Sequence, residues 1–297
     1  MGCLNSKTLS RKGLVKFVEK SNAAEIIHSE HQEIINKEDS GTSSALVFTE
    51  NFRKSQSAEE EFCFENTRVV ISDETKLFIP TNASYIDGFK DPDAYIITRT
   101  PDSNSTTEKF WRMIWIHKTE IIVMLDRQEE NWYGASFWDP DTESSLQFGK
   151  LNIKKFKTHQ NHSSFDILRV EVTHEDVGTL HVNYFIFRNW QRLNEAPLEC
   201  ELIDLIFMTR LYNQSAVTPE SLKGFKSPIV IHCSDGLQRS MVFCAVDIGI
   251  SAIIERGKVN LYSIVSKLRK ERYNCLHDVH DYSMCYLLLC YYCAFYM

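Results

Sequence analysis

The chain has 297 residues, of which 43% are hydrophobic and 25% are charged, and its formal net charge is −7. These proportions are those of a soluble globular protein, and they exclude intrinsic disorder over most of the length. The acidic balance argues against a nucleic-acid-binding protein, which normally carries a basic stripe, so no nucleic-acid partner is expected.

The first residues of the chain match a lipidation pattern. Gly2 becomes the N-terminus once Met1 is removed, and Ser6 stands at the position that the N-myristoylation motif favours. Cys3 lies where a second acyl chain is commonly added, and a single myristoyl chain binds membranes only marginally. We therefore expect myristate on Gly2 and palmitate on Cys3. The alternative is a basic tail in which the motif is coincidental.

Charge and composition predict how the chain is divided. Five basic residues and one acid give residues 1–20 a net charge of +4, which attracts the anionic lipids of the inner membrane leaflet. The 11 glycines and 7 prolines form no linker in the middle of the chain. We predict a basic, lipidated segment over residues 1–20 and a single domain over residues 21–297, held at the cytoplasmic face of the plasma membrane.

Hydrophobic periodicity predicts an α/β (α+β) fold, in which helices flank a central mixed twisted sheet. Apolar residues at helical spacing predict helices over 14–37, 106–116, 199–211, 240–254, 261–269 and 278–295. Runs rich in β-branched residues predict strands over 69–71, 95–98, 120–125, 149–156, 165–172, 179–187 and 228–231. The longest apolar run, residues 284–297, is too short to span a bilayer and predicts a buried terminal helix.

The nine cysteines are irregularly spaced, and a chain with this much core does not need a disulfide framework. Cys290 and Cys293, the closest pair, lie in an apolar aromatic tail without a nearby histidine. We therefore expect free, mostly buried thiols in a reducing compartment, and we expect neither a metal site nor a cofactor.

The segment His232 to Ser240, HCSDGLQRS, contains the residues with catalytic chemistry. A predicted buried strand ends at its start and a helix begins near Arg239. Loop N–H groups between these elements can point inward as an anion nest, reinforced by the positive end of the helix. A Cys233 thiolate is stabilised in such a setting, and the Arg239 guanidinium can bind two phosphate oxygens. The alternative is that Cys233 is one more buried thiol.

This segment resembles the signature of the cysteine-dependent protein tyrosine phosphatase family. Further family landmarks occur in order, at residues 66–69, 82–88, 110–115 and 122–125 and at Arg269, Arg272 and Tyr282. The resemblance covers residues 46–292 and implies the phosphatase fold. With its lipidation-like start, the chain resembles the tyrosine phosphatase-like proteins of bracoviruses, which act in infected insect cells.

The resemblance also assigns roles to the loop residues. Cys233 takes the position of the nucleophile that forms a phosphocysteine intermediate, and Ser240 supplies the hydroxyl that assists release of the thiolate. The residues in the phosphate-binding positions are Ser234, Asp235, Gly236, Leu237, Gln238 and Arg239.

The general acid of the family is replaced in this sequence. Active members protonate the leaving phenolate with an Asp in a Trp-Pro-Asp loop. Trp190 matches the Trp, but Gln191 and Arg192 occupy the Pro and Asp positions. An arginine cannot act as an acid near neutral pH, and the loss of acid catalysis typically costs about 10²–10⁴-fold in rate. Glu195 is a candidate substitute acid; the alternative is that it is a solvated loop carboxylate.

Other departures also weaken the active site. The family's pocket-wall Tyr aligns with Ala58, and the glutamine that orients hydrolytic water aligns with His277. Asp235 replaces a small neutral residue, and a carboxylate there raises the pKa of the thiol and repels phosphate. Gln238 and Met241 replace glycines.

These departures favour a pseudophosphatase that interferes with phosphotyrosine signalling in an infected host cell. It would act by binding host phosphotyrosine proteins or signalling components, in the host cytoplasm at the plasma membrane. The first alternative is a weakly active protein-tyrosine phosphatase that uses Glu195 or water as the acid. The second is a phosphatase of the same chemistry acting on phosphoinositides or RNA 5′-phosphates.

Overall fold

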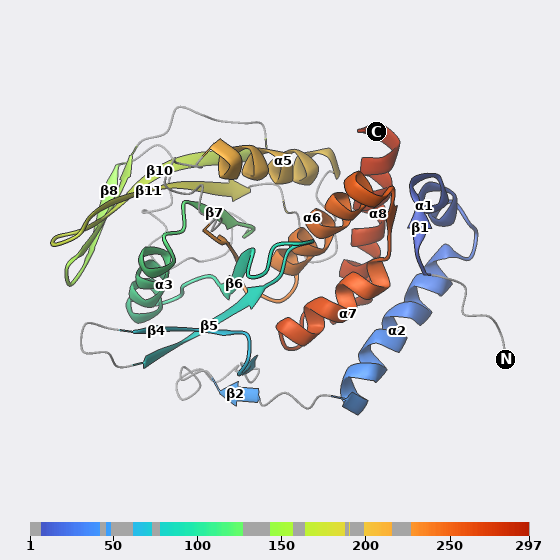
Figure 1. Ribbon diagram of the computed structural model, residues 1–297, viewed down its shortest axis with the longest axis horizontal. Coiled ribbons are helices and arrows are strands. Elements are labelled where there is room, and N and C mark those ends of the chain that lie inside the picture. The colour runs from blue at the N-terminus through green and yellow to red at the C-terminus, as the bar shows by residue number, and fades with distance from the viewer. Residues whose placement is uncertain are drawn as a thin grey trace.

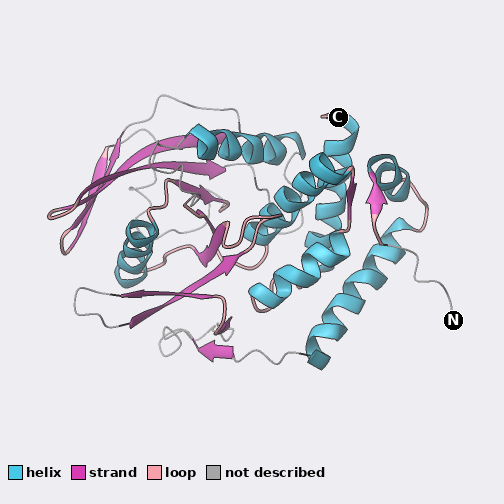
Figure 2. Cartoon of the chain, in the orientation of Figure 1, coloured by secondary structure: helices cyan, strands magenta, loops and turns pink. Residues whose placement is uncertain are grey.

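The computed structural model describes residues 7–41, 46–48, 62–72, 78–126, 143–156, 164–187, 190, 199–215 and 227–296. Within these residues a nine-stranded sheet runs through the molecule, with helices packed on its two faces (Figures 1 and 2). This arrangement confirms the predicted α/β fold with a mixed sheet.

The strand order of the large sheet is β4-β5-β6-β12-β7-β11-β10-β9-β8. Its members are β4 (Arg68–Ser72), β5 (Phe78–Ile86), β6 (Tyr95–Arg99), β7 (Ile121–Met124), β8 (Ser144–Phe148), β9 (Leu151–Phe156), β10 (Phe165–His174), β11 (Gly178–Phe187) and β12 (Ile229–Cys233). The four central strands β6, β12, β7 and β11 are parallel, and the outer pairings are antiparallel. β7 and β12 are buried along their whole length, as expected of parallel strands covered on both faces.

Seven helices lie in the described part of the chain. They are α1 (Arg11–Val18), α2 (Ala23–Gly41), α3 (Asn104–His117), α5 (Glu199–Ser215), α6 (Arg239–Arg256), α7 (Leu261–Glu271) and α8 (Val279–Phe295). α3 covers one face of the sheet, and the core on the other face is shared by α1, α2 and α5 to α8. None of the described helices is long and apolar enough to cross a membrane.

Two short antiparallel pairs complete the fold. β1 (Leu9–Ser10) pairs with β13 (Lys258–Val259), and β2 (Leu46–Phe48) pairs with β3 (Phe62–Phe64). The first pair ties the N-terminal region to the connection between α6 and α7.

The N-terminal region differs from the prediction in two ways. The helix predicted over residues 14–37 is two helices, which a turn over residues 19–22 separates. Ser10 caps α1 by accepting a hydrogen bond from the Gly13 amide, so the first helix begins earlier than its apolar residues indicate. Leu14 and Phe17 are buried in the core that contains α8, so α1 packs against the C-terminal helix.

β5 is the main strand that the pattern did not predict. It contains Pro80 and Asn82, which are uncommon in strands, and it gains its hydrogen bonds from its neighbours β4 and β6. Tertiary pairing therefore outweighs the local preference. β5 is important for the candidate site because Asn82 and Ser84 accept hydrogen bonds from Arg272, which binds the loop after β12.

Candidate active site

The loop after β12 begins at the centre of the sheet. β12 lies between the parallel strands β6 and β7 and ends at Cys233, and α6 begins at Arg239. Gly236 lies between them with a φ of +66°, and a Cβ atom there would lie 2.7 Å from the Thr98 carbonyl. Only glycine fits this position, because the backbone is left-handed and another strand passes close by. The predicted strand–turn–helix is therefore present.

The connection between α7 and α8 holds the loop from outside. Arg272 is fully buried, and its Nε donates to the Gly236 carbonyl at 3.3 Å. Its Nη2 donates to Oδ1 of Asn82 at 2.6 Å, which links the loop to β5. The Leu276 amide donates to the Leu237 carbonyl at 3.1 Å. The loop backbone is therefore fixed by two residues of the α7–α8 connection, and Arg272 also links it to β5.

Cys233 is fully buried at the base of the loop, and its Sγ donates to Oδ1 of Asp235 at 3.2 Å. Burial raises the pKa of the Cys233 thiol well above its ordinary value, and the negative charges of Asp235 and Asp126 raise it further. Ser240, on the first turn of α6, acts in the opposite direction, but its effect is weaker. The sulfur is therefore a protonated thiol at neutral pH.

The same Asp235 oxygen binds the backbone of its own loop. Oδ1 accepts hydrogen bonds from the Leu237 amide at 2.8 Å and from the Gln238 amide at 3.2 Å. These amides belong to the anion nest that the sequence predicted for phosphate. A carboxylate oxygen of the loop itself therefore accepts the hydrogen bonds from two nest amides that a phosphate oxygen would otherwise accept.

Arg239 is held in a buried ion pair. Its Nη1 donates to the Leu125 carbonyl at 3.2 Å and to Oδ1 of Asp126 at 3.4 Å. The sequence analysis missed Asp126, although it follows the buried strand β7 by two residues. Because β7 and β12 are parallel neighbours, their carboxyl ends meet at one edge of the sheet, and this relation was the available signal.

A chain of hydrogen bonds continues from Asp126 into the core. Thr100 donates its hydroxyl to Asp126, and its Oγ1 lies 2.6 Å from Nδ1 of His232. Nε2 of His232 lies 2.5 Å from the hydroxyl of Tyr184. Burial lowers the pKa of His232 to about 3, so its ring is neutral. A neutral ring that accepts from Tyr184 and donates to Thr100 satisfies the whole chain.

Comparison with known proteins identifies the family. The protein-tyrosine phosphatase family model matches residues 52–291. The chain belongs to the protein-tyrosine phosphatase family. This confirms the family that the loop motif predicted, and it confirms that one phosphatase domain accounts for most of the chain.

Relatives of this phosphatase-family chain occur in viruses and in animals. It is 28% identical over 291 residues to tyrosine phosphatase H2 of Microplitis demolitor bracovirus, covering 95% of this chain and 88% of that protein. It is 29% identical over 293 residues to tyrosine phosphatase-like protein J1 of the same virus, covering 96% of both. Rat tyrosine-protein phosphatase non-receptor type 9 is 30% identical over 272 residues, which are 88% of this chain and 45% of that protein. The predicted resemblance to bracovirus proteins is confirmed.

Several residues that the sequence analysis singled out are not placed. Arg192, Glu195, Ala58 and the lipidation candidates Gly2 and Cys3 all lie outside the described residues. Trp190 is placed: it is buried, and its ring packs edge-on against Phe187, with 6.2 Å between the ring centroids.

Polar residues near the start of α8 interact with the phosphatase loop. Gln238 hydrogen-bonds with His277, the residue at the water-orienting position. One turn later, burial raises the pKa of Asp281 to about 7, and the charges of Asp278 and Asp235 raise it as well. His277 and Arg239 partly oppose this shift. Asp281 therefore is a carboxyl group that interacts electrostatically with the loop, and the sequence analysis did not predict it.

Proposed function

We propose that this phosphatase-family protein is a pseudophosphatase that interferes with phosphotyrosine signalling in an infected host cell by binding host signalling proteins. The observation that carries the proposal is the position of Asp235. Its Oδ1 accepts hydrogen bonds from two nest amides and lies 3.2 Å from Sγ of Cys233. Phosphate would have to displace this carboxylate before it could reach the sulfur.

The chemistry of the family explains why this arrangement opposes turnover. In the first step the thiolate attacks phosphorus, and the aryl oxygen leaves with the bonding electron pair and takes up a proton. The Cys233 thiol has a raised pKa, so the thiolate is scarce at neutral pH. Arg192, at the position of the acid, holds its protons too tightly to release one near pH 7. Both the nucleophile and the acid are therefore compromised.

Location at the inner leaflet of the host plasma membrane is part of the same proposal. On α1, Lys12 and Lys16 are exposed on the side opposite the buried Leu14 and Phe17. A helix with one basic and one buried face can lie on an anionic bilayer while it remains packed on the domain. This supports a membrane-bound protein in which residues 1–6, the expected lipid-bearing segment, precede a basic surface.

A direct assay tests the proposal. Hydrolysis of an aryl phosphate by the purified protein is compared with hydrolysis by Cys233→Ser, which keeps the size of the side chain but lacks the thiol. We expect equal, background rates. A rate at least a hundred times that of Cys233→Ser would contradict the proposal. Host proteins captured with the full chain and with Arg239→Met then separate phosphate-dependent from phosphate-independent binding.

One observation favours a second candidate, a weakly active protein-tyrosine phosphatase. Asp281 interacts electrostatically with Asp235 and Arg239, and its pKa of about 7 would let it carry a proton at neutral pH. In this alternative Asp281 donates the proton that the family's missing Asp supplies. Activity above the Cys233→Ser background that falls by about 10²-fold in Asp281→Asn would support it.

A further inference from the structure

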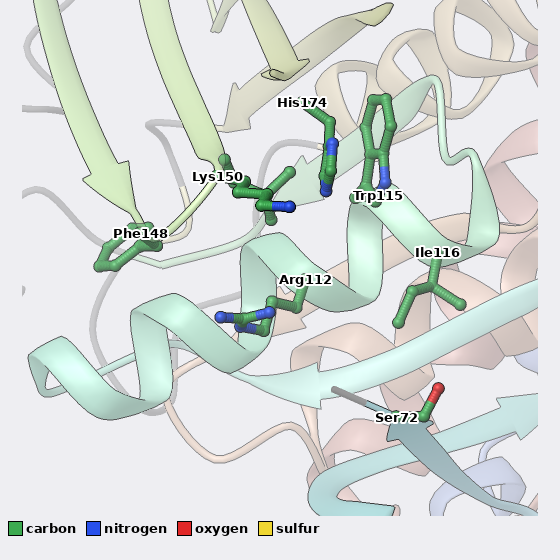
Figure 3. A pocket seen from close by; sticks show the side chains of 8 residues that line it. Ser72, Arg112, Trp115, Ile116, Phe148, Lys150 and His174 are labelled. Carbon is green, nitrogen blue, oxygen red and sulfur yellow. The ribbon is translucent and has the colours of Figure 1, made fainter. Parts of the chain in front are cut away.

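A pocket lies on the molecule away from the phosphatase loop, between α3 and the turn that joins β8 to β9 (Figure 3). Its volume is about 180 Å³. α3 contributes Arg112, Trp115 and Ile116, which share one face of the helix because they are spaced i, i+3 and i+4. The remaining lining residues are Ser72, Phe148, Lys150, Leu151 and His174. We call this the hairpin pocket.

Part of the hairpin pocket is apolar. Phe148 and Leu151 are buried side chains of the β8–β9 hairpin. Ile116 is 44% exposed, which is high for a side chain of this size and type. A ligand that covers Ile116 would remove apolar surface from water, which favours binding by about 25 cal/mol per Å².

The polar lining consists of groups that donate hydrogen bonds. The Asp176 amide donates to Nδ1 of His174 at 3.2 Å, so the proton of the neutral ring is on Nε2. Arg112 and Lys150 carry positive charge, and Ser72 has a hydroxyl. Among the described residues, the lining contains no carboxylate. An acceptor-rich anion therefore complements the pocket.

Arg112 and Lys150 each form an ion pair with a carboxylate that does not line the pocket. Arg112 uses Nε and Nη2 to bind Glu108, at 3.0 and 2.8 Å, which engages one edge of its five-donor guanidinium. Lys150 binds Asp176 at 2.7 Å, and the two side chains are 44% and 62% exposed. Such an exposed pair contributes little stability, so an incoming anion can share or replace it at low cost.

One wall of the pocket is stiffened by stacking. The rings of Trp115 and His174 are stacked at 18°, with 5.6 Å between their centroids. Lys118 places its Nζ 3.4 Å from the centroid of the Trp115 ring, which adds a third cation beside the pocket. A wall formed in advance lowers the entropy that a ligand must lose on binding.

We propose that the hairpin pocket binds a small organic anion, with its acidic head between Arg112 and Lys150 and its apolar stem against Ile116, Phe148 and Leu151. An aryl phosphate or an aryl carboxylate has this chemistry. The ligand could be a free metabolite or the modified side chain of a peptide. The inference does not depend on the proposed function, because the pocket shares no residue with the phosphatase loop.

Calorimetry on the full chain carrying Cys233→Ser tests the proposal with phenyl phosphate, phenylacetate, inorganic phosphate and benzyl alcohol. We expect saturable binding of the two aryl anions, and binding at least tenfold weaker for phosphate, which lacks the stem, and for the alcohol, which lacks the charge. A phosphotyrosine peptide that binds more tightly than phenyl phosphate would identify a peptide side chain as the source. Weaker binding of the peptide would identify a small metabolite. No saturable binding of either aryl anion would overturn the proposal.

Variants locate the binding. Lys150→Ala should weaken binding of phenyl phosphate about tenfold, as expected for the loss of one charge-assisted hydrogen bond. Ile116→Glu should abolish binding, because it places a carboxylate on the wall. Lys154→Ala is the matched control, an exposed lysine on β9 that does not line the pocket, and it should have no effect. The proposal would be overturned if binding persists in Lys150→Ala and Ile116→Glu but changes in Asp235→Ala. That result would place the ligand at the phosphatase loop.

Discussion

Oδ1 of Asp235 lies 3.2 Å from Sγ of Cys233 and accepts hydrogen bonds from the amides of Leu237 and Gln238. One carboxylate therefore both raises the pKa of the thiol and occupies part of the anion nest. These two effects can be separated, because the first depends on charge and the second on the position of an acceptor oxygen.

Asp235→Ala should lower the pKa of the Cys233 thiol and open the nest. We expect iodoacetamide to alkylate Cys233 about tenfold faster or more at pH 7, which corresponds to a thiol pKa lowered by about one unit. Mass spectrometry of the peptide that contains Cys233 measures the rate. Asp235→Asn removes the charge but keeps an acceptor oxygen. It should accelerate alkylation while binding of vanadate stays weak. Unchanged alkylation in both variants would show that the carboxylate does not control the thiol.

Gly236→Ala should destabilise the fold far more than the same change at Gly257. Both glycines have a φ of +66°, so each alanine carries a left-handed penalty of about 1–2 kcal/mol. At Gly257 the new Cβ meets nothing within 4 Å, whereas at Gly236 it lies 2.7 Å from Thr98 backbone atoms. Urea unfolding should show a total loss of about 3 kcal/mol or more for Gly236→Ala. Equal losses at the two sites would contradict the described close approach.

The contribution of Asp281 to the stability of the fold should fall as pH rises from about 4 to about 7. Its folded-state pKa is raised to about 7, so the folded protein holds a proton that the unfolded chain releases near pH 4. The protonated carboxyl therefore favours folding below pH 4, and this contribution is lost as pH rises through 7. Asp281→Asn should unfold at higher urea concentration than the natural protein at pH 8 and at a similar concentration at pH 4. The same difference at both pH values would argue against a raised pKa.

Lys12→Glu combined with Lys16→Glu should weaken binding to vesicles that contain phosphatidylserine. Each lysine near an anionic surface contributes about 1 kcal/mol, and each reversal adds repulsion, so we expect more than a tenfold loss in co-sedimentation of the unlipidated protein. Lys154→Glu with Lys109→Glu is the matched control, with two charge reversals outside α1. Raising the salt concentration should reduce binding of the natural protein, since the attraction is screened. Equal losses in the two double variants would show that α1 is not the binding face.

The sequence by itself determined the fold class, the family and the position of the loop. A buried apolar strand, the segment HCSDGLQRS and an apolar helix are all local patterns, and local patterns are preserved in the fold because β12 and α6 are buried almost completely. The same reasoning predicted that Asp235 would oppose the thiolate, because a residue two positions from Cys233 is close to it in any tight turn.

Only the tertiary structure decided which distant groups meet at the loop. Asp126 pairs with Arg239 because β7 and β12 lie side by side, although the two residues are 113 positions apart. Asp281 gains its raised pKa because the start of α8 is buried near the loop. The raised pKa of Asp281 depends on the loss of water to neighbours that are remote in the chain, so no periodicity or spacing could reveal it.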